Sequence, residues 1–216
     1  MASPFSPTMA ELRDRMVAVL RHRDIREERV LAAMRSVPRE EFVPEWAYER
    51  AYDDTALAIG QEQTISQPYV VAMMLQLAEI APDARVLEVG TGSGYAAALL
   101  SRLAAQVFTI ERQPMLFEIS RERLARLGFA NVRCRFGDGT AGWPEEAPFE
   151  AIMVSAGTPE APDALLVQLG QAGGRMIIPV GPQPSYQRLL RISRHDATTY
   201  ETEDFGPVSF VPLVRD

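Results

Sequence analysis

The chain has 216 residues and a hydrophobic content of 47%, which suits one domain with an ordinary buried core. Its net charge of −7 disfavours sequence-independent binding of nucleic acid, because such binding requires a basic surface. One cysteine and two histidines exclude an intrachain disulfide and a metal site rich in either residue, so we expect no metal. No apolar run reaches the length of a membrane span, and the first residues lack the layout of a signal peptide. We therefore expect a cytoplasmic protein without membrane contact.

The first 60 residues predict a helical extension in front of a core at 61–216, and the two together predict one domain. Thr8-Met-Ala-Glu11 resembles a capping box and predicts a helix to about Leu20. A second helix is expected from Ile25 to Arg35. Residues 42–59 show neither helix nor strand periodicity, so we expect irregular structure there.

The segment Gln63-Thr-Ile-Ser-Gln-Pro68 is unusual. Pro68 is placed to start a helix, with Ser66 or Gln67 near its cap. The hydroxyls of Thr64 and Ser66 would then converge with free N–H groups on one spot. The positive helix end there favours an anion such as a carboxylate. An ordinary helix cap without a ligand is the alternative interpretation.

A glycine-rich turn follows the first hydrophobic strand, in Arg85-Val-Leu-Glu-Val-Gly-Thr-Gly-Ser-Gly-Tyr95, and leads into a helix from Tyr95 to Ala104. Glycines at alternate positions let the backbone approach a ligand closely, with the N–H groups of the helix start facing it. The dinucleotide fingerprint fails because Tyr95 stands where its third small residue belongs, and a phosphate-binding loop fails because no Lys-Ser/Thr follows. A ligand without phosphates remains, such as the methionine end of S-adenosylmethionine. A tight turn without a ligand is the alternative.

From Arg85 onward strands and helices alternate, which predicts an α/β fold with a doubly wound, mostly parallel sheet. The expected parallel strands are Arg85–Gly90, Gln106–Glu111, Val132–Gly137, Phe149–Ser155 and Arg175–Val180. In such a sheet the ligand lies beyond the carboxyl ends of the strands. Gln187–Arg194 and Val208–Val214 have no helix between them, so we expect an antiparallel C-terminal edge.

Two acids stand at the ends of expected strands. Glu111 ends the second strand, where its carboxylate can accept hydrogen bonds from both hydroxyls of a ribose. Asp138 lies between Gly137 and Gly139 after the third strand, where it can accept a hydrogen bond from an adenine amino group. A simple Asp-Gly turn is the alternative for Asp138. The two acids and the Gly90 loop share one sheet edge, and this combination is more specific than any of its parts.

Further motifs occur in chain order. They are Arg39-Glu-Glu-Phe-Val-Pro44, Gly142-Trp-Pro144, Gly174-Arg-Met-Ile-Ile-Pro-Val-Gly181 and Phe210-Val-Pro-Leu213. Together with the segments already described, they resemble protein-L-isoaspartate O-methyltransferases over nearly the whole chain from about residue 30. Many methyltransferases share the glycine motif, whereas the Thr-Ile-Ser-Gln-Pro motif is much more specific to this family.

The resemblance implies a sheet of the S-adenosylmethionine-dependent methyltransferase type, with N-terminal helices and last strands ordered differently from the common version. It also implies S-adenosyl-L-methionine as methyl donor and isoaspartyl residues of damaged proteins and peptides as acceptors, a repair reaction. The family's active-site serine falls on Ser66. Two departures concern the acceptor: Gln61-Glu62 stands where members commonly carry a glycine, and Thr140 where they carry an aromatic residue. Glu62 would repel an acidic acceptor if it points inward, and do nothing if it points to solvent.

The predicted site has a donor part and an acceptor part. The predicted donor contacts are Gln63, Thr64, Ile65, Glu88, Gly90, Thr91, Gly92, Gly94, Glu111, Arg112, Asp138 and Gly139. The predicted acceptor contacts are Thr64, Ser66 and Gln67, with Ser66 as the catalytic residue. Two alternatives stay open: a carboxyl methyltransferase for a normal aspartate or another acid of a dedicated partner, and a donor-binding module without turnover. The sequence gives no sign of the oligomeric state.

Overall fold

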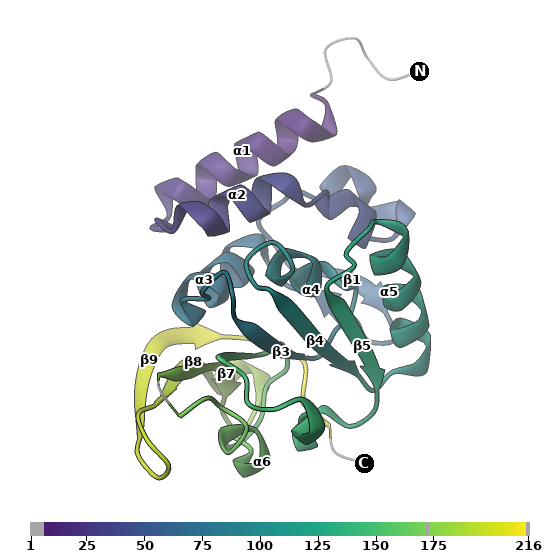
Figure 1. Ribbon diagram of the computed structural model, residues 1–216. Coiled ribbons are helices and arrows are strands. Elements are labelled where there is room, and N and C mark those ends of the chain that lie inside the picture. Colours follow the sequence, from purple (N-terminus) through teal and green to yellow (C-terminus); the bar gives the residue numbers. More distant parts are fainter. Residues whose placement is uncertain (1–6, 172, 215–216) are drawn as a thin grey trace.

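The structure is a computed structural model that describes residues 7–171 and 173–214 (Figure 1). The first six residues, which entered the expectation about location, lie outside the described residues. The helices are α1 (Met9–His22), α2 (Glu28–Ser36), α3 (Pro68–Ala78), α4 (Tyr95–Leu100), α5 (Pro114–Arg126) and α6 (Asp163–Leu166). The strands are β1 (Leu57–Gly60), β2 (Gln63–Ile65), β3 (Arg85–Val89), β4 (Gln106–Glu111), β5 (Val132–Phe136), β6 (Ala151–Val154), β7 (Gly174–Val180), β8 (Gln187–Arg194) and β9 (Tyr200–Val208).

The N-terminal helices form where the sequence predicts them. The N–H of Glu11 donates to the Thr8 hydroxyl at 3.2 Å, and the N–H of Thr8 donates to the Glu11 carboxylate at 2.7 Å, so the capping box is confirmed. The second helix begins at Glu28, three residues later than expected, because Glu27 caps it. Figure 1 shows α1 and α2 lying above α3 and α4. Within the described ranges, no helix is long and apolar enough to cross a membrane.

The prediction of irregular structure at residues 42–59 was incomplete. Short 3-10 helices lie at Arg39–Phe42 and Glu45–Arg50, and β1 pairs with β2 in an antiparallel hairpin. The hairpin turn contains Gln61 and Glu62 with φ of 52° and 58°. This left-handed conformation suits Gly or Asn, so the usual hairpin signal is missing from the sequence.

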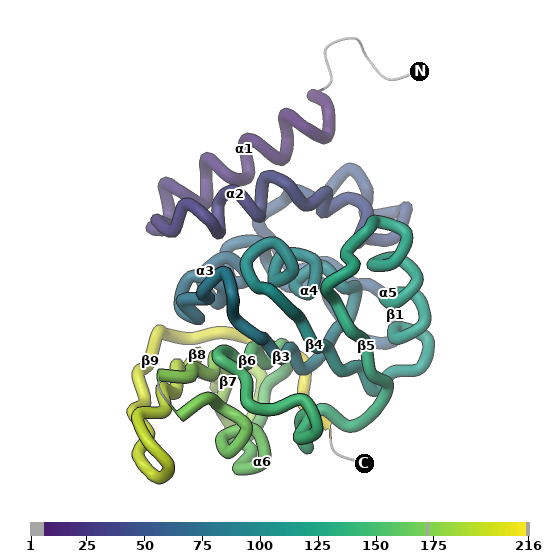
Figure 2. The backbone as a smooth tube through the Cα atoms, viewed as in Figure 1, coloured from purple at the N-terminus to yellow at the C-terminus, as the bar shows by residue number. Residues whose placement is uncertain are grey.

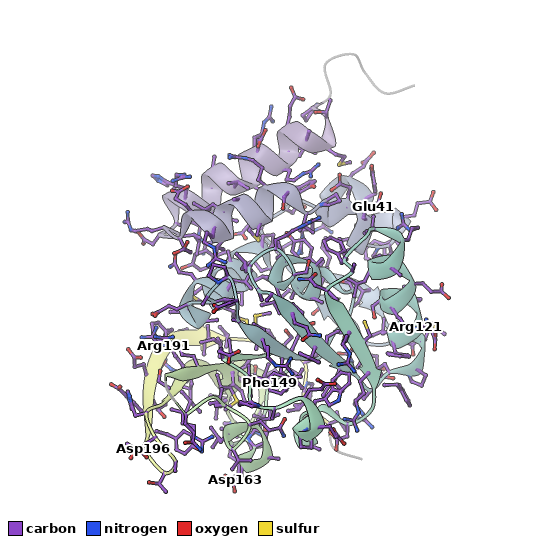
Figure 3. The ribbon with its side chains drawn as sticks, in the orientation of Figure 1. Glu41, Arg121, Phe149, Asp163, Arg191 and Asp196 are labelled. Carbon is purple, nitrogen blue, oxygen red and sulfur yellow. The ribbon has the colours of Figure 1, made fainter. Side chains whose placement is uncertain are left out.

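The main sheet has seven strands in the order β5-β4-β3-β6-β7-β8-β9, with β3 to β7 parallel and β8 and β9 antiparallel. Alternate residues face opposite layers. Val86 and Val107 pack in the cluster that contains α1 to α4, whereas Leu87 and Phe108 pack on the other face toward α6. In Figure 3 Phe149 lies in this second layer, and Asp163 points outward from α6. The predicted α/β fold with a mostly parallel sheet and an antiparallel edge is confirmed.

The last predicted strand was misplaced. Val208–Val214 is not a strand; β9 instead occupies residues 200–208, directly after the turn that follows β8. Its solvent side carries polar residues, so β9 lacks the apolar run on which the prediction relied. Figure 2 shows the yellow chain leaving β9 and returning toward the middle of the sheet. There the N–H of Gly157 donates to the Val211 carbonyl at 2.8 Å, and the N–H of Leu213 donates to the Gly157 carbonyl at 2.7 Å.

One predicted helix is shorter than expected. α4 ends at Leu100 rather than Ala104. The turn after α4 is held by Asn131, the chain's single asparagine. Its side-chain amide donates to the carbonyls of Ser101 at 3.0 Å and Ala104 at 3.2 Å. Asn131 thereby fixes this turn to the segment that enters β5.

Candidate active site

The candidate site lies where the direction of the strand order reverses, at the carboxyl ends of β3 and β6. These strands are neighbours, with Val89 opposite Val154, while the chain continues from β3 to β4 on one side and from β6 to β7 on the other. Such a point opens a crevice for a ligand in α/β sheets. A cavity, here called the switch-point pocket, is lined by residues 63–66, Val71, Met74, 88–93, Ala96, 110–113, Gly139, Met153, Ser155, Ala156 and 211–214.

The glycine loop turns its backbone toward this pocket. Gly90 and Gly92 have φ of 93° and 53°, and a Cβ at Gly92 would meet only the Ile59 side chain, at 3.6 Å. Gly94 has another role, since its Cβ would lie 3.3 Å from Leu124 on α5. Gly94 is not among the lining residues, and its lack of a side chain allows α5 to pack behind the loop.

Glu111 is nearly buried and connects the glycine loop to the next strand end. Its carboxylate accepts hydrogen bonds from the N–H groups of Gly92 and Gln113, each at 2.8 Å. The side chain is 5% exposed and lines the pocket. Each carboxylate oxygen has further lone pairs, so Glu111 can hold the loop and still accept from a ligand.

Glu88 is a fully buried acid in the floor of the pocket. The Thr109 hydroxyl donates to Glu88 Oε2 at 2.6 Å, and Thr109 in turn lies 2.6 Å from the Thr91 hydroxyl. Glu88 Oε1 has no hydrogen-bond partner among the described residues. Burial, and to a smaller extent the nearby Glu111 charge, raise the pKa of Glu88 to about 8, against the Thr109 hydrogen bond that lowers it. A buried acceptor without a partner is costly and marks a place for a donor group of a ligand.

The remaining predicted donor contacts lie around the same edge. Gln63, Thr64, Ile65, Thr91, Arg112 and Gly139 all line the pocket. Asp138 does not; its Oδ1 accepts the Thr140 N–H at 2.8 Å and caps a 3-10 turn. Gly139 has no room for a side chain, because a Cβ would lie 2.4 Å from Val89 Cγ1.

A second cavity, the hydroxyl cleft, adjoins the switch-point pocket and has a volume of about 620 Å³. It is lined by Asp54, Thr55, Ala56, Thr64, Ser66, Gln67, Val70, Ser155, Pro184, Ser185, 207–211. Hydroxyl groups dominate its polar lining, and Asp54 is its one ionisable residue. Thr64, Ser66, Ser155 and Val211 line both cavities, so the two meet along this wall.

The amino end of α3 differs from the prediction. Pro68 is the first helical residue, as expected, and Gln67 is the cap residue, but its side chain does not cap the helix. The sequence predicts free N–H groups at this helix start, but the Tyr69 N–H donates to Asp54 Oδ1 at 3.0 Å. Gln67 Nε2 donates to the main-chain carbonyl of Asp54 at 2.9 Å and to its carboxylate at 3.0 Å. The Asp54 carboxylate, which lies outside the Gln63–Pro68 motif, therefore already accepts one of the N–H groups at the positive end of α3.

Comparison with known proteins decides the family. The family model described as Protein-L-isoaspartate(D-aspartate) O-methyltransferase matches residues 11–216. The chain belongs to this family. A Protein-L-isoaspartate O-methyltransferase of Methylorubrum extorquens is 55% identical over 210 residues, which cover 97% of this chain and 91% of the relative. One of Brucella anthropi is 52% identical over 202 residues, which cover 94% of this chain and 93% of the relative.

Solved structures agree with this assignment. One protein-L-isoaspartate O-methyltransferase has a TM-score of 0.86 and 28% identity, covering 94% of this chain and 66% of that chain. A structure described as the Plasmodium falciparum enzyme in complex with S-adenosyl-L-homocysteine has a TM-score of 0.82 and 25% identity, covering 94% of this chain and 99% of that chain. The predicted family and fold are confirmed.

The departures from the isoaspartate methyltransferase pattern lie outside both cavities. Glu62 is exposed at the tip of the β1–β2 hairpin, and Thr140 is half-buried in the turn capped by Asp138. Neither lines the switch-point pocket or the hydroxyl cleft. The solvent orientation considered for Glu62 is therefore the one observed.

Sequence reasoning missed the opposite wall of the site. Ser155 follows β6 at the switch point, and strand-end logic would have found it. Residues 211–214 carry no such signal, because they reach the pocket only after β9 has turned back. Gln187 holds this segment: its Oε1 accepts the Phe210 N–H at 2.7 Å, and its Nε2 donates to the Phe210 carbonyl at 3.2 Å.

Proposed function

We propose that the protein transfers a methyl group from S-adenosyl-L-methionine to the free carboxylate of L-isoaspartyl residues in damaged proteins and peptides. One observation carries the proposal beyond family membership: the switch-point pocket and the hydroxyl cleft meet at Thr64, Ser66 and Ser155. A donor and an acceptor bound in adjoining cavities can then react across a shared wall.

The residues of the switch-point pocket fit the donor. When bound, S-adenosylmethionine supplies a methyl group on a positively charged sulfur. Glu111 adds an acidic group to the pocket that would receive this cation, and the buried Glu88 Oε1 lacks a partner among the described residues. The loop Gly90–Gly92 offers backbone without side chains. We assign the ribose hydroxyls to Glu111, while the adenine contact of Asp138 stays a prediction.

The acceptor side needs orientation rather than a base. A carboxylate is ionised at neutral pH and is already a nucleophile, so no proton has to be removed from it. The barrier lies in desolvation and in aligning oxygen, methyl carbon and sulfur, to which proximity contributes up to roughly 7–11 kcal/mol in the best intramolecular cases. We assign Ser66 to orient the acceptor carboxylate, with Thr64 beside it on the same wall.

Ser66→Ala tests this assignment. Turnover with an isoaspartyl peptide should fall by roughly tenfold to a thousandfold, while the affinity for S-adenosylhomocysteine stays nearly intact. Ser193→Ala is the matched control, because Ser193 lies on β8 and lines neither cavity. A paired peptide with normal aspartate should not be methylated; equal methylation of both peptides would contradict the acceptor class. A Ser66→Ala enzyme with unchanged turnover would reduce the serine to a structural role.

We further propose that residues 1–60 and 61–216 act as one methyltransferase domain. The β1–β2 hairpin spans that boundary, and one buried cluster joins Leu20 and Met34 of the extension to Leu99 of the core. The net charge of −7 supports protein acceptors over nucleic acid. A cytoplasmic location stays a prediction.

A further inference from the structure

Arg39 is a buried cation between the N-terminal extension and the core. Its side chain is 0% exposed. Nε donates to the Ala51 carbonyl at 2.8 Å, and Nη2 donates to the Ser66 carbonyl at 2.8 Å. The guanidinium also lies 4.8 Å from the ring centre of Tyr95, the buried first residue of α4 after the glycine loop.

Keeping a charge in this place is costly. No ion pair of Arg39 with a carboxylate is found among the described residues, and its Nη1 has no hydrogen-bond partner there. Burial lowers the pKa of the guanidinium, while the Tyr95 hydroxyl opposes that shift. An apolar side chain would avoid the desolvation cost, so the contacts that only a guanidinium can make need an explanation.

Those contacts converge on the Ser66 peptide. A planar guanidinium presents several N–H donors in a fixed fork, so it can hold the Ala51 and Ser66 carbonyls at once; a lysine ammonium lacks this geometry. The next residue, Gln67, is held on the other side by Asp54. Arg39 thus holds the Ser66 carbonyl and Asp54 holds the Gln67 side chain, where the switch-point pocket and the hydroxyl cleft meet.

We propose that Arg39 is a positioning residue: by holding the Ser66 carbonyl it sets the direction of the Ser66 hydroxyl toward the acceptor carboxylate. This inference rests on the proposed function of Ser66. Arg39 lines neither cavity, so it acts only through the serine and its loop.

Arg39→Lys is the first test, because it keeps the charge and removes the fork. Turnover with an isoaspartyl peptide should fall roughly tenfold to a hundredfold, and the affinity for S-adenosylhomocysteine should change less than about twofold. If Arg39→Lys does not fold, as judged by loss of S-adenosylhomocysteine binding, the neutral Arg39→Gln takes its place. Wild-type turnover in a folded variant would overturn the proposal.

Arg194→Lys is the matched control. Arg194 is 6% exposed, its Nη1 donates to the Leu169 carbonyl at 2.7 Å, and its guanidinium lies 5.7 Å from the ring centre of Tyr200. It is therefore a similar buried clamp at the far edge of the sheet. Arg194→Lys should lower the melting temperature without lowering turnover in the remaining folded enzyme; an equal loss of turnover would show that any such clamp matters and would overturn the proposal.

A double-mutant cycle separates positioning from general support. In a Ser66→Ala background Arg39→Lys should lower turnover by less than about twofold, because the hydroxyl it positions is gone. If Arg39→Lys lowers turnover by the same factor in both backgrounds, Arg39 does not act through Ser66 and the proposal fails, while the role of Ser66 stands. If Ser66→Ala alone has wild-type turnover, the role of Ser66 fails, and the inference for Arg39 fails with it.

Discussion

Asp54 Oδ1 accepts the Tyr69 N–H at 3.0 Å, so a carboxylate of the chain itself caps the amino end of α3. Asp54 also pairs with Arg23 and lines the hydroxyl cleft. This helix end therefore already holds a negative group of the chain itself. We expect hydroxyl groups, rather than the helix end alone, to orient an acceptor carboxylate.

Replacing this charge should have opposite effects on binding and stability. Asp54→Asn should lower the KM for an isoaspartyl peptide by about fivefold at low salt, since removing a nearby like charge is worth roughly 1 kcal/mol. The free energy of unfolding should fall by roughly 1–2 kcal/mol, because the cap and its charged hydrogen bonds weaken. Asp53→Asn is the control, as Asp53 pairs with Arg50 and does not line the cleft. A KM that rises in Asp54→Asn would show that the carboxylate assists the acceptor.

Glu62→Gly should stabilise the protein without improving acceptor binding. Glu62 has φ of 58°, where a residue with a Cβ is strained by roughly 1 kcal/mol or more, and glycine is not. The free energy of unfolding, measured in urea, should rise by about 1 kcal/mol at most. The greater freedom of glycine in the unfolded chain offsets part of this gain. Because Glu62 lines neither cavity, the KM for an isoaspartyl peptide should stay constant at low salt; a fall would show that its charge reaches the site.

Glu88 should make stability depend on pH in a defined window. Its pKa is raised from 4.5 to about 8 in the folded protein, so folding favours the protonated form. The stabilisation is fully present below the unfolded pKa and is lost as the pH rises through 8, at most about 1.4 kcal/mol per pH unit. Glu88→Gln should remove this slope in urea unfolding between pH 5 and pH 8, giving a difference of roughly 3–5 kcal/mol over the window. Glu118→Gln, at an exposed position on α5, should leave this dependence of stability on pH unchanged.

Identical slopes in the wild type and Glu88→Gln would mean that Glu88 is ionised throughout this range. Carbonyl infrared absorption of a protonated carboxylic acid, present at pH 6 in the wild type and absent from Glu88→Gln, gives an independent check.

Glu111→Ala should weaken S-adenosylhomocysteine binding by roughly 1.5–3 kcal/mol in calorimetry, the range for hydrogen bonds to a charged group. Glu111→Gln keeps an oxygen that can accept the Gly92 N–H, so it should lose less. Gly92→Val should abolish binding by placing a side chain where the loop faces the pocket. Unchanged affinity in Glu111→Ala would remove the ribose assignment.

The pocket on the donor side can be anticipated from the sequence because each part of it is local. A strand, a glycine turn and an acid at the next strand end appear as short patterns, and parallel topology brings Gly90 and Glu111 together. Two predicted contacts, Gly94 and Asp138, do not line the pocket, and their contact with a donor stays a prediction. They adjoin lining residues, and sequence spacing does not show which side of a turn faces the ligand.

The acceptor side depends on contacts between distant segments. Asp54 reaches the helix start from another turn, Arg39 joins two main-chain carbonyls, and carbonyl groups leave no residue pattern to recognise. The β1–β2 hairpin is hidden because Gln61 and Glu62 adopt a conformation that the sequence does not favour. Family resemblance identified Ser66, but not the groups that hold it.

Asn131 has a consequence for how this protein ages. Isoaspartate forms from asparagine in two steps: the main-chain nitrogen of the next residue attacks the side-chain amide carbon and ammonia leaves, and water then opens the resulting succinimide. In this chain the amide of the single asparagine donates to the Ser101 and Ala104 carbonyls, and the Val132 N–H that would attack donates to the Phe129 carbonyl at 3.2 Å. Both reacting groups are held in place, and the attacking nitrogen belongs to a β-branched residue, Val132. We therefore expect Asn131 to resist deamidation, one of the lesions that produce isoaspartyl residues.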